Sequence, residues 1–315
     1  MDPPVWPHRG IHPVLPAVNG IEARLKETNG NESKRTVPVD SHKEGEREMP
    51  AHAVNGCVPI DDTDMYYVSF GTGSRSLIML PGLSDGLTTV QGKAWLLAGT
   101  YRKYLRDFTV YMFSRKNKMP EGYTIRQMAA DQAAVMEKLG IRRACIAGVS
   151  QGGMIAQYLA IDHPELVEKL VLAVTAPCAN ESSNQVIQTW IDLARQGDHI
   201  ALMNDTAEKM YTKAYLKKNR RLLSFVARLT KPADYERFLI NALAILDFDA
   251  RSELHRITCP TLILAGSDDH TVGNEAPYEL NQSIPDSELY IFEGYGHGVF
   301  EEDRTFYDKI LEFLK

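Results

Sequence analysis

The stretch of residues 145–162, with the sequence CIAGVSQGGMIAQYLAID, constrains the fold of this chain more than any other. Small and β-branched residues over 144–149 predict a short buried strand, and a run rich in Ala, Ile, Leu and Gln predicts a helix over 154–162. Ser150 lies between them, with Gly148 and Gly152 two residues away on either side, an arrangement called a nucleophile elbow. The turn is so tight that a Cβ at either glycine would collide with the opposite backbone. The sequence therefore predicts a strained serine at the edge of a sheet and at the amino end of a helix.

The pattern G-x-S-x-G occurs by chance in on the order of one in ten chains of this length, so its surroundings decide its meaning. Apolar and β-prone runs alternate with helical runs along most of the chain. Strands are expected at 77–80, 108–113, 144–149, 170–174, 261–265 and 289–292, and helices at 95–104, 124–139, 154–162, 278–283 and 306–314. This alternation predicts an α/β fold with right-handed βαβ units and a mostly parallel sheet covered by helices on both faces. A leading hairpin, at 57–60 and 65–70, would add antiparallel edge strands.

Two segments depart from the alternation. Residues 178–250 contain four consecutive helical runs with no strand between them, which predicts an inserted helical lid; the runs are 184–195, 200–217, 221–229 and 234–244. The α/β core would then comprise 57–177 and 251–315. Residues 1–56 hold seven of the sixteen prolines and few periodic apolar positions, so we expect a flexible N-terminal extension.

Composition limits the partners and the compartment. The net charge of -6 argues against a nucleic-acid or anionic-membrane surface, and the basic run at 217–221 is interpreted as a solvated helix face. The four cysteines show no metal or redox spacing, and no phosphate loop, His pair or dinucleotide motif is present, so we expect neither a metal nor a cofactor. Because the amino terminus lacks the apolar region of a signal peptide and no run reaches membrane-spanning length, we expect a soluble cytoplasmic protein. Its oligomeric state is left open.

A serine hydroxyl is a weak nucleophile that needs a base, which in turn needs an orienting acid. In a strand–elbow–helix architecture the expected order along the chain is serine, acid, histidine. Asp268 and Asp269 follow the strand at 261–265, at the sheet edge where sites form, and only one of the two can face a histidine. His297 follows the last strand and is flanked by glycines that would let the backbone approach the serine. We expect His297 to be the base.

Acyl transfer also needs donors for the developing oxyanion. The backbone N–H of Gln151, directly after the serine, is one candidate, and that of Leu83, in the loop after the strand at 77–80, is the other. Met154 beside the elbow, together with Trp190 and Tyr211 in the helical segment, is predicted to line an apolar pocket that binds substrate, although packing of the lid helices is the favoured interpretation for any single one of them.

Several of these motifs resemble those of the α/β-hydrolase superfamily, in particular small carboxylesterases and lactonases that carry a lid. The resemblance begins near residue 57 and rests on four segments: LPGLSDG at 80–86, GVSQGGMIAQYLAIDHPELVEKLVL at 148–172, AGSDDHTV at 265–272 and GYGHG at 294–298. It implies Ser150 as nucleophile and His297 as base, and it favours Asp269, three residues after a glycine, over Asp268 as the acid. Pro81-Gly82 replaces the His-Gly that frequently precedes the oxyanion residue, which puts the shape of that loop in question.

The resemblance implies a cofactor-independent serine hydrolase that cleaves a small-molecule carboxylic ester, lactone or thioester through an acyl-enzyme. Two alternatives remain from the sequence. An aminopeptidase of the proline-iminopeptidase type would need carboxylates of the helical segment to bind the substrate's amino group, for which Asp192, Glu208 or Glu236 could serve. The second alternative is a protein that keeps the α/β-hydrolase scaffold but binds a ligand without catalysing a reaction.

Overall fold

The computed structural model describes residues 52–315. Most of the extension predicted for residues 1–56, from position 1 to 51, therefore lies outside the described residues. The first strand begins at Val54. The eight strands are β1 (Val54–Ile60), β2 (Thr63–Phe70), β3 (Arg75–Leu80), β4 (Phe108–Phe113), β5 (Ala144–Val149), β6 (Val167–Ala173), β7 (Thr261–Gly266) and β8 (Ser287–Phe292).

These strands form one sheet in the order β1-β2-β4-β3-β5-β6-β7-β8. The hairpin β1–β2 pairs antiparallel to β4, and every later pairing is parallel. The connection from β2 to β3 passes over β4, and the connection from β4 to β5 passes over β3, which places β5 near the middle of the sheet. The prediction of a mostly parallel α/β sheet with antiparallel edge strands is confirmed.

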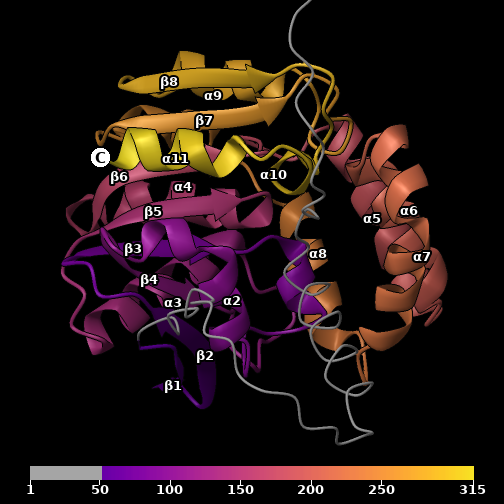
Figure 1. Ribbon diagram of the computed structural model, residues 1–315, viewed down its shortest axis with the longest axis horizontal. Coiled ribbons are helices and arrows are strands. Elements are labelled where there is room, and N and C mark those ends of the chain that lie inside the picture. The colour runs from indigo at the N-terminus through magenta and orange to yellow at the C-terminus, as the bar shows by residue number, and fades with distance from the viewer. Residues whose placement is uncertain (1–51) are drawn as a thin grey trace, which may run out of the picture.

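Helices cover both faces of the sheet (Figure 1). They are α2 (Ala94–Thr100), α3 (Ile125–Lys138), α4 (Gln151–Asp162), α9 (Ala276–Ser283), α10 (Val299–Glu302) and α11 (Phe306–Leu314). Strand residues alternate between two buried clusters: Ile78 and Ile146 belong to the cluster that includes α3 and α4, and Leu77 and Cys145 to the one that includes α2 and α11. Burial on both faces explains why these strands are continuously apolar.

The remaining four helices, α5 (Glu181–Arg195), α6 (His199–Met210), α7 (Lys213–Leu229) and α8 (Glu236–Leu246), form a helical insertion between β6 and β7. They lie beyond the carboxyl ends of the parallel strands (Figure 1). The ends of the insertion are joined by an antiparallel bridge between Cys178 and Asp249. Its inner helix α8 packs on the short 3-10 helix η1 (Leu83–Gly86), where a Cβ on Gly86 would lie 2.9 Å from Phe238 Cα.

The internal boundaries of this insertion differ from the sequence-based prediction. One helix was expected over 200–217 and another over 221–229, whereas the structure ends α6 at Met210 and runs α7 unbroken from Lys213 to Leu229. The break lies at Thr212, whose Oγ1 accepts a hydrogen bond from Tyr215 N at 3.2 Å and caps α7. Likewise Asn180 forms a capping box with Ser183, so α5 begins at Glu181 rather than at 184.

Candidate active site

Ser150 occupies the turn between β5 and α4 with φ 54° and ψ -120°, angles that a residue with a side chain rarely adopts. Two hydrogen bonds hold it in place. Its N–H donates to Ala173 O on the neighbouring strand β6 at 2.9 Å, and its carbonyl accepts from Thr175 Oγ1 at 2.8 Å. The strain is therefore maintained by β6 and the segment that follows it. The side chain is partly exposed at this edge of the sheet.

The glycines of the elbow are required by close backbone approach. A Cβ on Gly148 would lie 2.3 Å from Gly152 O, and a Cβ on Gly152 would lie 2.1 Å from Leu80 O. Neither position can carry any other residue without moving the main chain. The predicted collision with the opposite glycine is confirmed for Gly148, whereas a Cβ on Gly152 would meet the end of β3 instead.

Asp269 and His297 form a buried pair, each no more than 3% exposed. Asp269 Oδ2 lies 2.9 Å from His297 Nδ1. The other carboxylate oxygen, Oδ1, accepts the backbone N–H groups of Thr271 at 3.0 Å and Val272 at 3.2 Å, so the loop after β7 fixes the carboxylate. The neighbouring Asp268 is exposed, and the one hydrogen bond that its carboxylate accepts within residues 52–315 comes from the adjacent Ser267 hydroxyl.

The loop after β3 passes beside the serine. A Cβ on Gly82 would lie 3.4 Å from Ser150 Cβ and 3.9 Å from Ser150 Oγ. Leu83 opens η1 and Gln151 opens α4, and within residues 52–315 neither backbone N–H has a hydrogen-bond acceptor. No hydrogen bond joins Ser150 Oγ to His297 in this same part of the chain. The structure thus pairs Asp269 with His297 and, within residues 52–315, leaves the N–H groups of Leu83 and Gln151 without an acceptor.

A buried charged network that the sequence did not reveal lies behind these two donors. Asp85, in η1 and 2% exposed, accepts hydrogen bonds from Ser114 Oγ at 2.7 Å, Arg115 N at 2.9 Å and Arg237 Nη2 at 2.6 Å. Its carboxylate also lies 4.0 Å from Arg115 Nη1. Burial opposes ionisation of Asp85, but the two guanidinium groups and these hydrogen bonds outweigh it and hold its pKa below the usual range.

The same network reaches the residue after the serine. Arg115 Nη2 donates to Gln151 Oε1 at 2.9 Å, and Gln151 Nε2 donates to Asn241 O on α8 at 2.7 Å. Both candidate oxyanion donors, Leu83 through Asp85 and Gln151 through its amide, are thereby fixed relative to each other and to the helical insertion. The sequence held one hint of this network, since Arg115 lies two residues after β4 and sites form at the carboxyl edge of a parallel sheet, but it gave no hint of Asp85 or Arg237 as partners.

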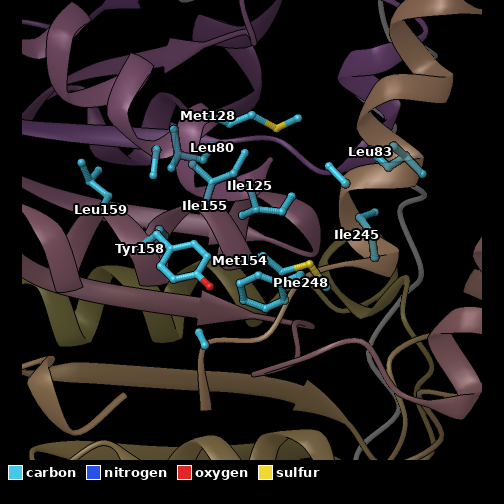
Figure 2. Close-up of a cluster of buried hydrophobic side chains, with 14 of the residues drawn as sticks. Leu80, Leu83, Ile125, Met128, Met154, Ile155, Tyr158, Leu159, Ile245 and Phe248 are labelled. Atoms are coloured by element: carbon cyan, nitrogen blue, oxygen red, sulfur yellow. The ribbon is translucent and has the colours of Figure 1, made fainter. Parts of the chain in front are cut away.

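The three residues predicted to contact substrate are each engaged elsewhere in the protein. Met154 is 2% exposed and belongs to the same buried cluster as Phe248 (Figure 2). Trp190 is 6% exposed, and its Nε1–H donates to Asp205 Oδ2 on α6 at 2.8 Å. Tyr211 donates its hydroxyl to Glu301 Oε2 at 2.7 Å. These contacts are consistent with a packing role for the three side chains, and their role in binding substrate stays a prediction.

Two hollows open on the helical insertion, and neither is lined by Ser150, Asp269 or His297. One, of about 690 Å³, lies between the end of α5 and α8 and includes Leu239 and Leu243. Among residues 52–315 no three His, Cys, Asp or Glu side chains are grouped to hold a metal ion. In this part of the chain every helix is too short or too polar to cross a bilayer.

Residues 77–304 match the family model described as the alpha/beta hydrolase fold. The chain belongs to the α/β-hydrolase family. This assignment agrees with the sheet order, with the elbow after β5, and with the acid and histidine on the loops after β7 and β8. The family resemblance inferred from the sequence is confirmed.

Known α/β-hydrolase relatives match this chain over most of its described length. The 3-oxoadipate enol-lactonase 2 of Acinetobacter baylyi is 24% identical over 268 residues, which cover 85% of this chain and 99% of that protein. The AB hydrolase superfamily protein YisY of Bacillus subtilis is 31% identical over 201 residues, which cover 61% of this chain and 74% of that protein. The solved enol-lactonase of Burkholderia xenovorans has a TM-score of 0.72 at 23% identity and covers 82% and 99%, which shows the shared fold.

Proposed function

We propose that this α/β-hydrolase cleaves a carboxylic ester, lactone or thioester through an acyl-enzyme on Ser150, without a cofactor. The observation that carries the proposal is the buried pair of Asp269 and His297, joined at 2.9 Å, on loops beside a serine held in a strained elbow. A strained serine and a carboxylate-oriented imidazole are the parts that nucleophilic acyl transfer needs. The lactonase and hydrolase names of the relatives support the same reaction class.

The hydrogen bonds of Asp269 determine which nitrogen of His297 acts as the base. Because Oδ1 already accepts two backbone N–H groups, Oδ2 accepts the Nδ1 proton of His297, and Nε2 carries the free lone pair. In the proposed reaction Nε2 takes the Ser150 hydroxyl proton as Oγ attacks the acyl carbonyl. The same nitrogen then gives that proton to the departing alcohol or thiol, and a water molecule completes hydrolysis by the reverse route. We infer that the contact between Ser150 and His297 closes when substrate binds.

The free N–H groups of Leu83 and Gln151 would stabilise the oxyanion of the tetrahedral intermediate. The network of Asp85 and Arg115 supports this role, since it fixes the η1 loop and the Gln151 side chain together. We further propose that the helical insertion α5–α8 acts as a lid, because it lies beyond the strand ends that carry the site (Figure 1). The peptidase alternative lacks such support, since Asp192, Glu208 and Glu236 are all exposed.

The decisive experiment uses a fluorophosphonate probe, which reacts with an activated serine. We expect stoichiometric labelling at Ser150, and hydrolysis of aryl esters and lactones that falls on the order of 10⁴-fold or more in Ser150→Ala. The exposed Ser224 on α7 provides a matched control, and Ser224→Ala should label and turn over normally. A folded wild-type protein that neither labels nor hydrolyses any acyl ester or lactone would exclude the proposal. Turnover of aminoacyl-arylamides in preference to esters would favour the peptidase instead.

A further inference from the structure

The connection between α6 and α7 lies directly against the loop that carries His297. Three consecutive residues, Met210 to Thr212, contact the segment 298–302, and we call this contact surface the clamp. At its centre Gly298 N donates to Met210 O at 2.7 Å, one residue after the histidine. A Cβ on Gly296 would lie 3.0 Å from the same carbonyl oxygen. The helical insertion therefore contacts the backbone on both sides of His297.

The ring of Tyr211 is packed on the histidine loop. A Cβ on Gly298 would lie 2.5 Å from Tyr211 Cδ1, so only the missing side chain lets the ring approach this closely. On its other side the ring stacks on Tyr215 of α7, with centroids 4.7 Å apart. Tyr211 is thus held between the loop and the lid helix, which explains why it does not continue α6.

Two carboxyl groups of α10 complete the clamp. Glu301 Oε2 accepts the Tyr211 hydroxyl at 2.7 Å. Glu302 accepts Thr212 N at 2.9 Å through Oε1 and Thr212 Oγ1 at 2.5 Å through Oε2. Thr212 Oγ1 also accepts the hydrogen bond that caps α7. A continuous chain of hydrogen bonds therefore runs from the N-terminus of α7 through Thr212 to Glu302, in the segment that follows His297. A carboxylate is also favourably placed at the N-terminus of α7.

The side chain of His297 is fixed by Asp269 only at Nδ1, which leaves the position of its backbone to its surroundings. The loop on either side of it is glycine, which imposes little conformation of its own. Given the function proposed above, we propose that Tyr211 and Glu301 are positioning residues whose hydrogen bond docks the lid on the loop of His297 and so sets the height of the base over Ser150. Tyr211, predicted from the sequence as a substrate contact, then acts through the histidine loop instead.

The test compares two hydroxyl deletions on the stacked tyrosine pair. Tyr211→Phe keeps the ring and removes the bond to Glu301, whereas the Tyr215 hydroxyl makes no hydrogen bond within residues 52–315, which makes Tyr215→Phe the matched control. With a soluble aryl ester we expect Tyr211→Phe to lower kcat about tenfold with KM within about twofold, because misplacing a base by a fraction of an ångström slows chemistry without weakening binding. Tyr215→Phe should stay within about twofold of wild type in both constants. Glu301→Gln keeps an acceptor for the tyrosine and should retain most of kcat.

A second measurement does not depend on turnover. Hydrogen exchange of the peptides that contain Gly298 and residues 205–216 should accelerate in Tyr211→Phe and remain unchanged in Tyr215→Phe, with thermal melts confirming that both variants fold. Unchanged kcat together with unchanged exchange would overturn the clamp. A rise in KM alone would overturn it as well, and would return Tyr211 to substrate binding. If wild type has no hydrolase activity but exchange still responds to Tyr211→Phe, the docking stands and only the proposed reaction fails.

Discussion

Removing the charge of Asp85 should strongly destabilise the protein. Asp85→Asn preserves shape but leaves the buried guanidinium group of Arg115 and the partly exposed one of Arg237 without a counter-charge, 4.0 and 2.6 Å from the altered group. Breaking a buried ion pair in this way costs about 3–5 kcal/mol, because the remaining charge cannot return to water. For a chain of this size each kcal/mol lowers Tm by roughly 2–4 °C, so we expect a fall of roughly 6–20 °C.

The measurement is equilibrium urea unfolding at pH 7, with Asp62→Asn as the matched control. Asp62 lies 3.5 Å from Lys118, both side chains are more than three-quarters exposed, and its loss should change the free energy of unfolding by no more than about 0.5 kcal/mol. Adding Arg237→Met to Asp85→Asn should recover part of the stability, because one of the two unpaired charges is removed. If Asp85→Asn costs less than about 1 kcal/mol, as little as its exposed counterpart, the network is not held by charge and the reasoning fails.

Two further changes test the elbow and the clamp. In Gly152→Ala the new Cβ would meet Leu80 O at 2.1 Å, so we expect the free energy of unfolding, measured in urea, to fall by about 3 kcal/mol or more. The control is Gly99→Ala, on the exposed face of α2 with nothing within 4 Å, which should stabilise the protein by about 0.5–1 kcal/mol. Equal effects of the two substitutions would refute the steric argument. Burial raises the pKa of Glu301 to about 8, with Glu302 adding like charge. Because the fold favours the protonated acid, its contribution to stability should be complete below about pH 4.5 and lost as pH rises through about 8. Glu301→Gln should therefore flatten this part of the pH–stability curve, and a curve unchanged from wild type would refute the assignment to Glu301. The groups that face Glu301 are Tyr101, Tyr211, Tyr215, Tyr307 and Glu302.

The elbow was predictable because most of what forms it is local. The strand, the two glycines and the helix lie within the nineteen residues 144–162, and the clash that excludes a Cβ at Gly148 involves Gly152, only four residues away. Asp269 and His297 were also reachable from the sequence, since each follows an apolar strand and parallel strands bring their carboxyl ends to one edge. The choice between Asp268 and Asp269 needed the family resemblance, and the structure pairs only Asp269 with the histidine.

The network of Asp85, Arg115 and Arg237 could not be predicted because its members come from three distant segments. In sequence each is an ordinary polar residue of a loop or helix, and polar residues are exposed by default. Their burial depends on the packing of α8 against η1, where Gly86 admits Phe238, and this packing is a tertiary contact with no periodic signature. Only after the helix is in place does Arg237 reach Asp85 at 2.6 Å.

The missed break between α6 and α7 has the same cause and bears on function. Helical periodicity and good helix formers continue through residues 200–217, so local preference favours one helix, and a lone threonine is too weak a cap to end it. The structure stops α6 at Met210 because Tyr211 packs on Gly298 and Thr212 is bonded by Glu302, both from the histidine loop about ninety residues later. Tertiary contacts therefore override local preference at the point where the proposed lid contacts the loop of the base. Conflicts of this kind gather at functional sites, which supports the assignment of the clamp to the working part of the molecule.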